Sequence, residues 1–100
     1  MADRQINLSP VSRATNISTA TTTTVKSGGG VLVRIVCNKA VASGVITIYD
    51  NTAGSGTLIG TITEPATLLA TQWMLDYGCG FATGLTIVTG QADDLTVIWQ

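Results

Sequence analysis

Apolar and polar residues alternate with a period of two along much of the chain, which is the pattern of β-strands with one buried face. The clearest case is the segment VLVRIVCN at residues 31–38. Every second residue of this segment lies on one wholly apolar face, formed by Val31, Val33, Ile35 and Cys37. We expect this face to lie in the core and Arg34, on the other face, to point outward, where it can contact a partner.

The segment ITIYDNTAGSGTLIGTIT, residues 46–63, places two strand-like runs on either side of a loop of small residues. A phosphate-binding P-loop needs a lysine after its glycines and a helix behind them. The residues after Gly56 instead follow a strand pattern, and no lysine occurs after Lys39. The segment is therefore predicted to be a hairpin, with strands at 45–49 and 57–63 and a loop at 50–56.

Two further strands are predicted at residues 84–90 and 93–100, which are linked by a short turn. The second of them has an apolar face formed by Leu95, Val97 and Trp99. This alternation is typical of a strand that packs one face against the core.

The segment TLLATQWMLDYGCGF at residues 67–81 fits two patterns, and it follows a corner marked by Glu64 and Pro65. Its first apolar residues could line a helix, whereas its last ones alternate as in a strand. Gly78 and Gly80 would each cost a helix about 1 kcal/mol. The later part of the segment is therefore predicted to be a strand.

The first part of the chain is polar and shows no periodicity. Residues 1–16, which include Pro10, are predicted to form an extended N-terminal arm outside the core. The threonine-rich residues from 18 to 26 favour an extended backbone and lead into a glycine turn. With seven or eight short antiparallel strands about 8 to 12 residues apart, residues 17–100 are predicted to form one all-β domain, a jelly-roll-like or immunoglobulin-like β-sandwich.

The charge content is low, since only 11% of the residues are charged, against roughly 25% in typical soluble domains. A surface of hydroxyl groups and small side chains is suited to being covered by another protein. The charges are also unevenly distributed: residues 1–39 carry a net charge of +4 and residues 40–100 a net charge of −5, which gives −1 overall. This asymmetry indicates either an oriented association through a basic tail or pairing of the two halves within the fold.

The chain contains no histidine, so catalysis would depend on carboxylates, cysteine or lysine. Asp93 and Asp94 are adjacent, and on a strand they would point to opposite faces and could not act together as acid and base. We interpret them as turn residues that open the last strand. Cys79 lies between two glycines with no base to activate it. We therefore predict that the protein is not an enzyme and has no catalytic or cofactor-binding residues.

Metal binding and cofactors are likewise not expected. Cys37 and Cys79 lack the spacing of zinc ligands, and no histidine can complete a ligand set. Both are expected to be reduced, buried thiols. Asp50, Asn51 and Thr52 could bind calcium weakly, but a plain turn capped by the Asp50 and Asn51 side chains is the favoured interpretation.

Several classes of partner are also disfavoured. Five lysine and arginine residues among 100 can make few phosphate contacts, so no nucleic acid is expected. No run approaches the roughly 18 apolar residues of a membrane span, and the start of the chain lacks the apolar region of a secretory signal. We expect no membrane partner and synthesis in the cytosol. Trp73 and Tyr77 keep a carbohydrate-binding module as an alternative, although such residues are more often part of a core.

Four stretches of the sequence resemble a family of small all-β proteins from tailed bacteriophages and prophages. The sequence motifs of this family are a threonine-rich segment before a glycine turn, V-L-x-R-I-V-x-N, I-T-I-Y-D-N-T-A-G-S-G-T, Y-G-x-x-F-x-x-G-L-T-V-V-T and A-D-L-T-V-x-[YW]. The matching segments are 31–38, 46–57, 77–89 and 92–99. The resemblance covers about residues 21–100, departs from the family pattern at 64–75, and does not include residues 1–20.

This resemblance implies a virion structural protein, and first of all a capsid decoration or cement protein. Such a protein clamps subunits of the major capsid protein on the outside of the phage head. The resemblance also implies a homotrimer, because decoration proteins commonly occupy three-fold positions. A head-fibre or tail-associated protein is the alternative. The candidate partner-binding residues are Arg4, Arg13, Arg34 and Trp73.

Overall fold

The structure is a computed structural model that describes residues 11–100. These residues form eight strands and no helix. The strands are β1 (Arg13–Ile17), β2 (Thr22–Ser27), β3 (Gly30–Lys39), β4 (Val45–Asp50), β5 (Thr57–Thr63), β6 (Trp73–Phe81), β7 (Gly84–Thr89) and β8 (Asp94–Trp99). No helix able to span a membrane is therefore present in the described part of the chain.

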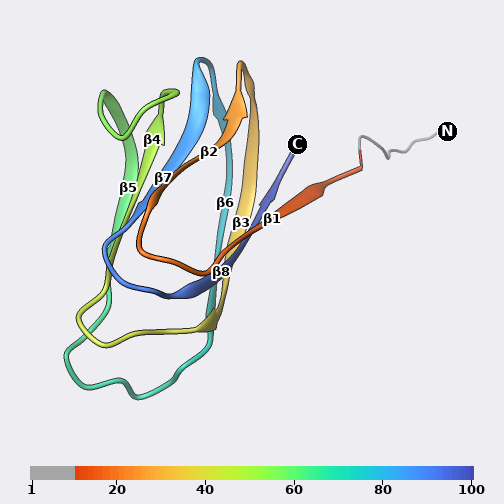
Figure 1. The fold of residues 1–100 in the computed structure, drawn as a ribbon. Helices are drawn as coiled ribbons and strands as arrows, with labels where there is room; N and C mark the ends of the chain where they lie inside the picture. The colour runs from red at the N-terminus through yellow and green to blue at the C-terminus, as the bar shows by residue number, and fades with distance from the viewer. Residues whose placement is uncertain (1–10) are drawn as a thin grey trace, which may run out of the picture.

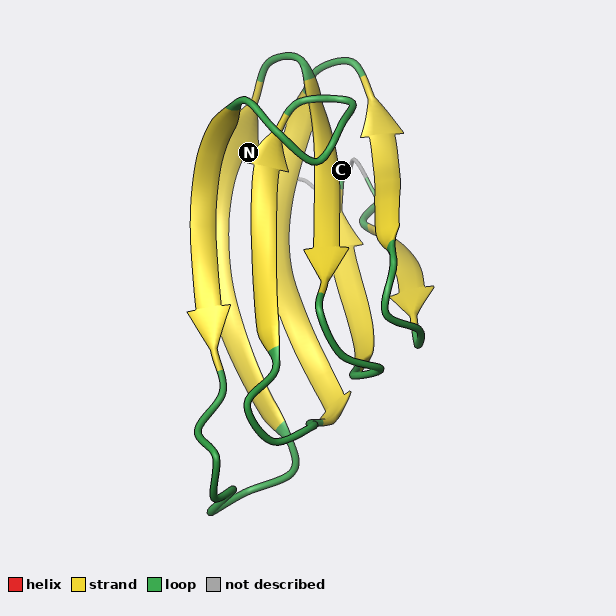
Figure 2. Cartoon of the chain, turned by 60° about the vertical axis from the view of Figure 1, so that its left-hand side comes forward, coloured by secondary structure: helices red, strands yellow, loops and turns green. Residues whose placement is uncertain are grey.

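The strands form two packed sheets in which all neighbours are antiparallel (Figure 1; Figure 2). The sheets have the orders β1-β8-β3-β6 and β2-β7-β4-β5. The first strand thus pairs with the last, the second with the seventh, the third with the sixth and the fourth with the fifth. The chain is folded like one long hairpin whose strand pairs alternate between the sheets, which is the jelly-roll arrangement. The predicted all-β sandwich is confirmed, and the topology selects the jelly-roll alternative.

The positions of the strands agree closely with the sequence pattern. The strand predicted at 57–63 is β5, with the same ends. Those predicted at 31–38, 45–49, 84–90 and 93–100 match β3, β4, β7 and β8 to within one residue at each end. Strands with one buried face are recognisable from their own residues because the period of two is local.

The core lies between the two sheets and consists mainly of aliphatic side chains. Its fully buried aliphatic members are Leu32, Ile35, Ile46, Ile48, Leu85, Ile87, Leu95 and Val97. Trp99 packs against them, and its Nε1 donates a hydrogen bond to Thr15 Oγ1 at 3.0 Å. The predicted apolar face of the last strand is therefore confirmed.

In β3 the predicted alternation is only partly correct. Ile35 and Cys37 are buried as expected, but Leu32 is buried in place of Val31 and Val33, which are half-exposed. The register of β3 shifts between Leu32 and Arg34 against both of its neighbours. A bulge of this kind adds a residue and so reverses which side chains face the core on one side of it.

The predicted arm requires a correction where it meets the domain. Residues 13–16 were expected to lie outside the core, but they belong to β1, which pairs with β8 over its whole length. Ile17 closes the strand in a buried position. Most of β1 is exposed because it is an edge strand, so its side chains are polar and carry no clear apolar alternation. Residues 1–10 lie outside the described part of the chain.

The ambiguous segment is a strand from Trp73 onward, and the helical alternative is wrong. β6 pairs with β3 along its length, with an irregular register between Asp76 and Cys79. Gly78 has a φ of 57°, a left-handed conformation that glycine adopts without strain. Residues 64–72 form the irregular connection between β5 and β6, seen in the lower part of Figure 1.

Candidate functional site

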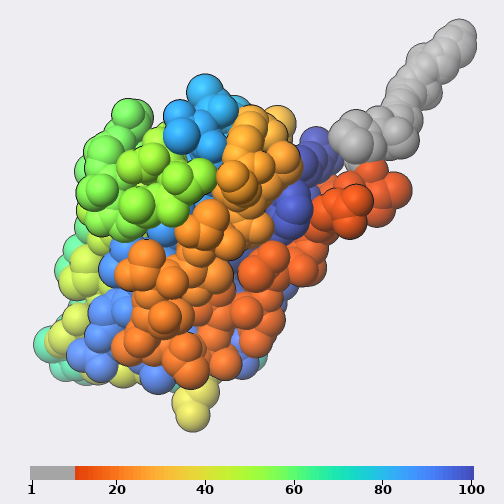
Figure 3. Space-filling model, turned by 45° about the horizontal axis from the view of Figure 1, so that its top comes forward, coloured from red at the N-terminus to blue at the C-terminus, as the bar shows by residue number. Residues whose placement is uncertain are grey.

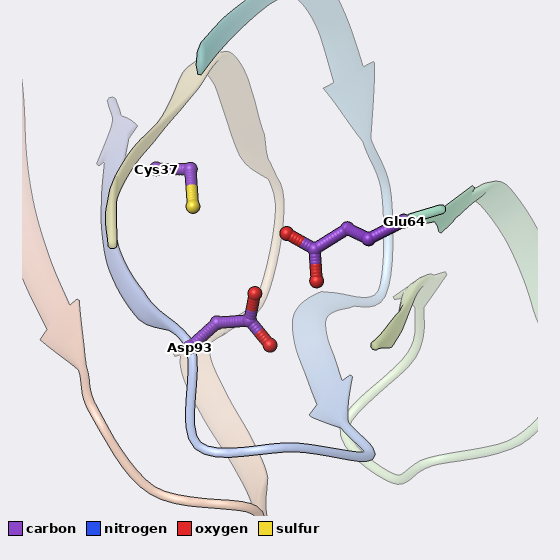
Figure 4. Close-up of side chains that lie close together, drawn as sticks. All are labelled: Cys37, Glu64 and Asp93. Carbon is purple, nitrogen blue, oxygen red and sulfur yellow. The ribbon is translucent and has the colours of Figure 1, made fainter. Parts of the chain in front are cut away.

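One group of side chains in the described part of the chain has the composition of a chemical site. It consists of Cys37, Glu64 and Asp93, whose sulfur and carboxylate oxygens lie within 4.8 Å of one another. The three residues are 1%, 4% and 0% exposed, respectively. Figure 4 shows the thiol and both carboxyl groups pointing toward a shared space from three different segments. We call this group the acidic cluster.

The acidic cluster is assembled by the jelly-roll topology at one end of the sandwich. Cys37 points inward near the end of β3, Glu64 follows the end of β5, and Asp93 precedes β8. The amide of Glu64 donates to the carbonyl of Gly44 at 2.8 Å. The turn between β3 and β4 thereby fixes the position of Glu64 in the backbone.

Each carboxyl group has one oxygen held by the protein and one that is not. Glu64 Oε2 accepts a hydrogen bond from Trp73 Nε1 at 3.1 Å, and Asp93 Oδ2 accepts one from the amide of Val41 at 3.1 Å. The other two oxygens, Glu64 Oε1 and Asp93 Oδ1, are buried and have no hydrogen-bond donor among the described residues. Such atoms are rare in folded proteins and indicate a proton, ion or water that satisfies them.

Gly44 is the residue that lets the two unpartnered oxygens approach the turn. A Cβ at this position would overlap Glu64 Oε1 and would lie 2.9 Å from Asp93 Oδ1. The preceding residue, Ser43, has a φ of 60°, which is uncommon for a residue other than glycine. The turn is therefore shaped tightly around the two carboxyl groups.

Burial sets the protonation of the cluster. Burial and, after it, the neighbouring Asp93 carboxyl group together raise the pKa of Glu64 to about 7, against the hydrogen bond from Trp73, which acts in the opposite direction. Below that pH the two carboxyl groups can share one proton, which two close carboxylates strongly favour. Burial, followed by the charges of Glu64 and Asp93, also raises the pKa of the Cys37 thiol to about 11. The thiol is then protonated at neutral pH and is a weak nucleophile.

The other loop considered from the sequence is organised by hydrogen bonds. Both carboxylate oxygens of Asp50 accept from the amide of Ala82, at 3.1 and 3.0 Å, and Oδ1 also accepts from that of Thr83 at 2.8 Å. The bonds from Ala82 and Thr83 lower the pKa of Asp50. The loop lies beside the turn at residues 82–84 (Figure 3). Asn51 Nδ2 donates to the carbonyl of Ser55 at 2.7 Å, so the predicted capping of the loop is confirmed for Asn51, whereas Asp50 caps the neighbouring turn at residues 82–84.

The structure does not bring the candidate partner-binding residues together. Arg4 lies outside the described residues. Arg13 is exposed on β1, at the opposite edge of its sheet from β6, which carries Trp73. Arg34 forms an ion pair with Asp76 at 2.9 Å, which joins the basic and acidic halves of the chain. Trp73 is half-buried against the core and donates to the acidic cluster.

Sequence reasoning missed the acidic cluster. It considered Asp93 only beside Asp94 and interpreted it as a turn residue, whereas Asp93 is fully buried next to Glu64. Asp94 does point elsewhere, as expected, and its Oδ1 accepts from Asn16 Nδ2 at 2.7 Å. The two cysteines are free, but only Cys37 is buried, so the expectation of two buried thiols is half correct.

Comparison with known proteins returns no matching family model, no similar protein of curated function and no similar solved structure. The comparisons therefore assign neither a family nor a function to the chain. Its function is inferred below from its surface, its fold and the resemblance seen in its sequence.

Proposed function

We propose that the protein is a decoration, or cement, protein of a tailed bacteriophage. In this role it binds the outside of the head and stabilises contacts between subunits of the major capsid protein. The resemblance of residues 21–100 to small phage virion proteins supports this role, and the jelly roll is an architecture used in viral capsid domains. A fold alone does not fix a function, so the proposal depends on a surface suited to the task.

The observation that carries the proposal is an apolar edge along β6. Leu69, Met74 and Leu75 are 98%, 54% and 41% exposed, and they lie on β6 or on the connection before it. We call these three residues the β6 edge. β6 is the last strand of its sheet, so one side of its backbone has no strand partner among residues 11–100. An exposed apolar edge strand is a site at which another chain can associate.

Contact with a capsid would cover side chains that are otherwise in water. Full burial of one Leu or Met side chain stabilises by about 1.5–3 kcal/mol. Met74 and Leu75 are already about half-buried, so covering the three side chains can contribute a few kcal/mol to adhesion without any charged contact.

The remaining parts of the proposal follow from the resemblance. The protein acts as a homotrimer on the capsid exterior after synthesis in the bacterial cytoplasm, and it is not an enzyme. The carbohydrate-binding alternative is less well supported. Trp73 and Tyr77 are half-buried and pack against the core, so their rings are not free to stack on a sugar. A head-fibre or tail role uses the same surface and is distinguished by where the protein binds.

Co-sedimentation with expanded phage heads that lack this protein tests the proposal. The native protein should bind heads saturably, and the double variant Leu69→Ser, Met74→Ser should bind at least about tenfold more weakly, which corresponds to 1.4 kcal/mol. Val45→Ser is the matched control, because Val45 is a partly exposed aliphatic residue on the other sheet. Binding to purified tails or glycans but not to heads would overturn the proposal, as would unchanged head binding by the double variant.

A further inference from the structure

The acidic cluster has the donor atoms of a metal site. One sulfur and two carboxylate oxygens, from Cys37, Glu64 and Asp93, lie within 4.8 Å of one another. Zinc forms bonds of about 2.3 Å to sulfur and about 2.0–2.2 Å to oxygen, so two ligands of one tetrahedral ion lie about 3.3–3.7 Å apart. The three donor atoms would therefore move together by up to about 1.5 Å when they bind a common ion.

A second, independent observation points to a ligand at the same place. Glu64 Oε1 and Asp93 Oδ1 are buried and receive no hydrogen bond from residues 11–100, and both lie beside Gly44, where a Cβ would occupy their space. Leaving a charged acceptor buried and unsatisfied costs more than the roughly 1–3 kcal/mol typical of a neutral group. A bound cation would satisfy both oxygens at once.

The other oxygen of each carboxyl group accepts a hydrogen bond from the protein, as is common for carboxylates that bind metal ions. Trp73 Nε1 donates to Glu64 Oε2 and the amide of Val41 donates to Asp93 Oδ2, both at 3.1 Å. Hydrogen bonds of this kind orient metal-binding carboxylates and leave the second oxygen free to coordinate. The carboxyl groups are therefore oriented before any ion arrives.

We propose that Cys37, Glu64 and Asp93 bind one thiophilic divalent metal ion of the zinc class. Zinc accepts both thiolate and carboxylate ligands in four-coordinate sites, and a water molecule can complete this set. Calcium and magnesium instead require about six or more oxygen ligands, which this cluster does not provide. The inference is independent of the proposed role on the phage head.

Metal binding replaces protons in the cluster. The neutral Cys37 thiol loses its proton to form the metal–sulfur bond, and the proton shared by Glu64 and Asp93 also leaves. Two protons go to solvent, and a dication bound by one thiolate and two carboxylates has a net charge of −1. A bound dication favours the deprotonated thiol, and the affinity should rise with pH.

A surface depression lies beside the end of β3 and the start of β6. This shallow depression of about 380 Å³ is lined by Val36, Cys37, Asn38, Gln72, Trp73 and Met74. It includes one ligand and the tryptophan that orients another. A bound ion would join the end of β3 to the segments before β6 and β8, and so would hold three connections at one end of the sandwich together.

Titration of the reduced, EDTA-treated full chain with Co²⁺ and Zn²⁺ tests this proposal. We expect one Co²⁺ per chain, with the visible spectrum of tetrahedral cobalt and a thiolate-to-cobalt charge-transfer band that Zn²⁺ abolishes by displacement. Cys37→Ser should remove the charge-transfer band and weaken binding by more than about tenfold, the smallest loss expected even for an outer partner of a metal site. Excess Mg²⁺ or Ca²⁺ should not displace the cobalt.

Two controls keep the result interpretable. Cys79→Ser removes the other free cysteine and should leave the spectrum and affinity unchanged. Glu64→Gln preserves the hydrogen bond from Trp73 and should weaken binding while leaving the circular dichroism of the protein unaltered. The proposal is overturned if the folded native chain binds neither ion saturably. In that case a proton shared by Glu64 and Asp93 would be the explanation for the two oxygens without donors. It is equally overturned if Cys79→Ser, and not Cys37→Ser, abolishes the band.

Discussion

The two ends of the sandwich hold carboxyl groups under opposite conditions. At one end, Asp50 is partly exposed to solvent and accepts hydrogen bonds from the backbone amides of residues 82–84. At the other end, Glu64 and Asp93 are buried, and each keeps one oxygen without a donor. The amides lower the pKa of Asp50, whereas burial raises that of Glu64. The same functional group is thus stabilised as an anion at one end and as an acid at the other.

The difference shows that donors, more than position in a loop, decide the state of a carboxyl group. A turn directs several N–H groups at one anion without any help from a charged side chain. At the acidic cluster, the surrounding chain supplies one donor to each carboxyl group and adds a second carboxyl instead of a base. That end is consequently suited to a proton or a cation, and the Asp50 end needs neither.

The largest expected effect comes from filling the space at Gly44. In Gly44→Ala the new Cβ would overlap Glu64 Oε1 and press on Asp93 Oδ1, and overpacking of this kind costs about 1–3 kcal/mol. Gly29→Ala at the Asp50 end is the matched control, because its Cβ would lie 3.4 Å from the nearest atom, an ordinary van der Waals distance. Chemical denaturation of both variants measures the contrast. Equal losses would mean that the acidic cluster is not tightly packed.

The second prediction concerns the pH dependence of the metal-free protein. The folded pKa of Glu64 is about 7, above its ordinary value of 4.5, so the unfolded chain loses this proton first as the pH rises. The resulting stability is fully present below about pH 4.5 and is lost as the pH rises to about 7. Glu64→Gln imitates the protonated form, so it should match the native protein at low pH and be more stable above pH 7.

Thermal melts in EDTA across this pH range measure the effect. A difference of 1 kcal/mol corresponds to about 4–8 °C for a domain of 60–100 residues, so a shift of several degrees should be resolved. A Glu64→Gln variant that is less stable than the native protein at every pH would contradict the assignment of a shared proton.

Much of the fold was predictable from the sequence because the relevant signals are local. The period of two defines β4, β5, β7 and β8, and the composition excludes a helical domain. The choice between a jelly roll and an immunoglobulin-like sandwich depends on pairings between distant strands, such as β1 with β8. The bulge between Leu32 and Arg34 contains no glycine or proline from which it could have been predicted.

The two ends differ in the same way. Asp50 and Asn51 form a recognisable turn signal, because Asn51 binds groups within its own loop. Glu64 and Asp93 carry no such signal, since their environment comes from segments that meet only in the folded chain. Gly44 is the one local clue, and its meaning depends on knowing which side chains approach it. The acidic cluster was therefore not accessible from the pattern of the sequence.

The third prediction tests the Asp50 end with Asp50→Asn. The amide oxygen of asparagine accepts the bonds of residues 82–84 more weakly than a carboxylate does, so the melting temperature at neutral pH should fall by a few degrees. The pKa of Asp50 is lowered below 3.8 in the folded state, so its stabilisation is present above that pH and is lost on acidification. The native protein and the variant should converge at low pH, the reverse of the trend at Glu64. If the melting temperatures of the native protein and the variant still differ at low pH, the charge of Asp50 is not the cause of the difference.

The smallest effect is expected for Asp76, a carboxylate at neither end. It forms an ion pair with Arg34 at 2.9 Å, and the two side chains are 67% and 43% exposed, respectively. Water and salt screen such a pair, which typically contributes about 0–1 kcal/mol. Asp76→Asn should therefore change the melting temperature little, and the small difference should vanish at high salt. The pKa shifts of Glu64 and Asp50 should depend less on salt, because burial and backbone hydrogen bonds cause them. If Asp76→Asn destabilises more than Asp50→Asn, the ion pair rather than the amide donors is the stronger support of an exposed carboxylate in this fold.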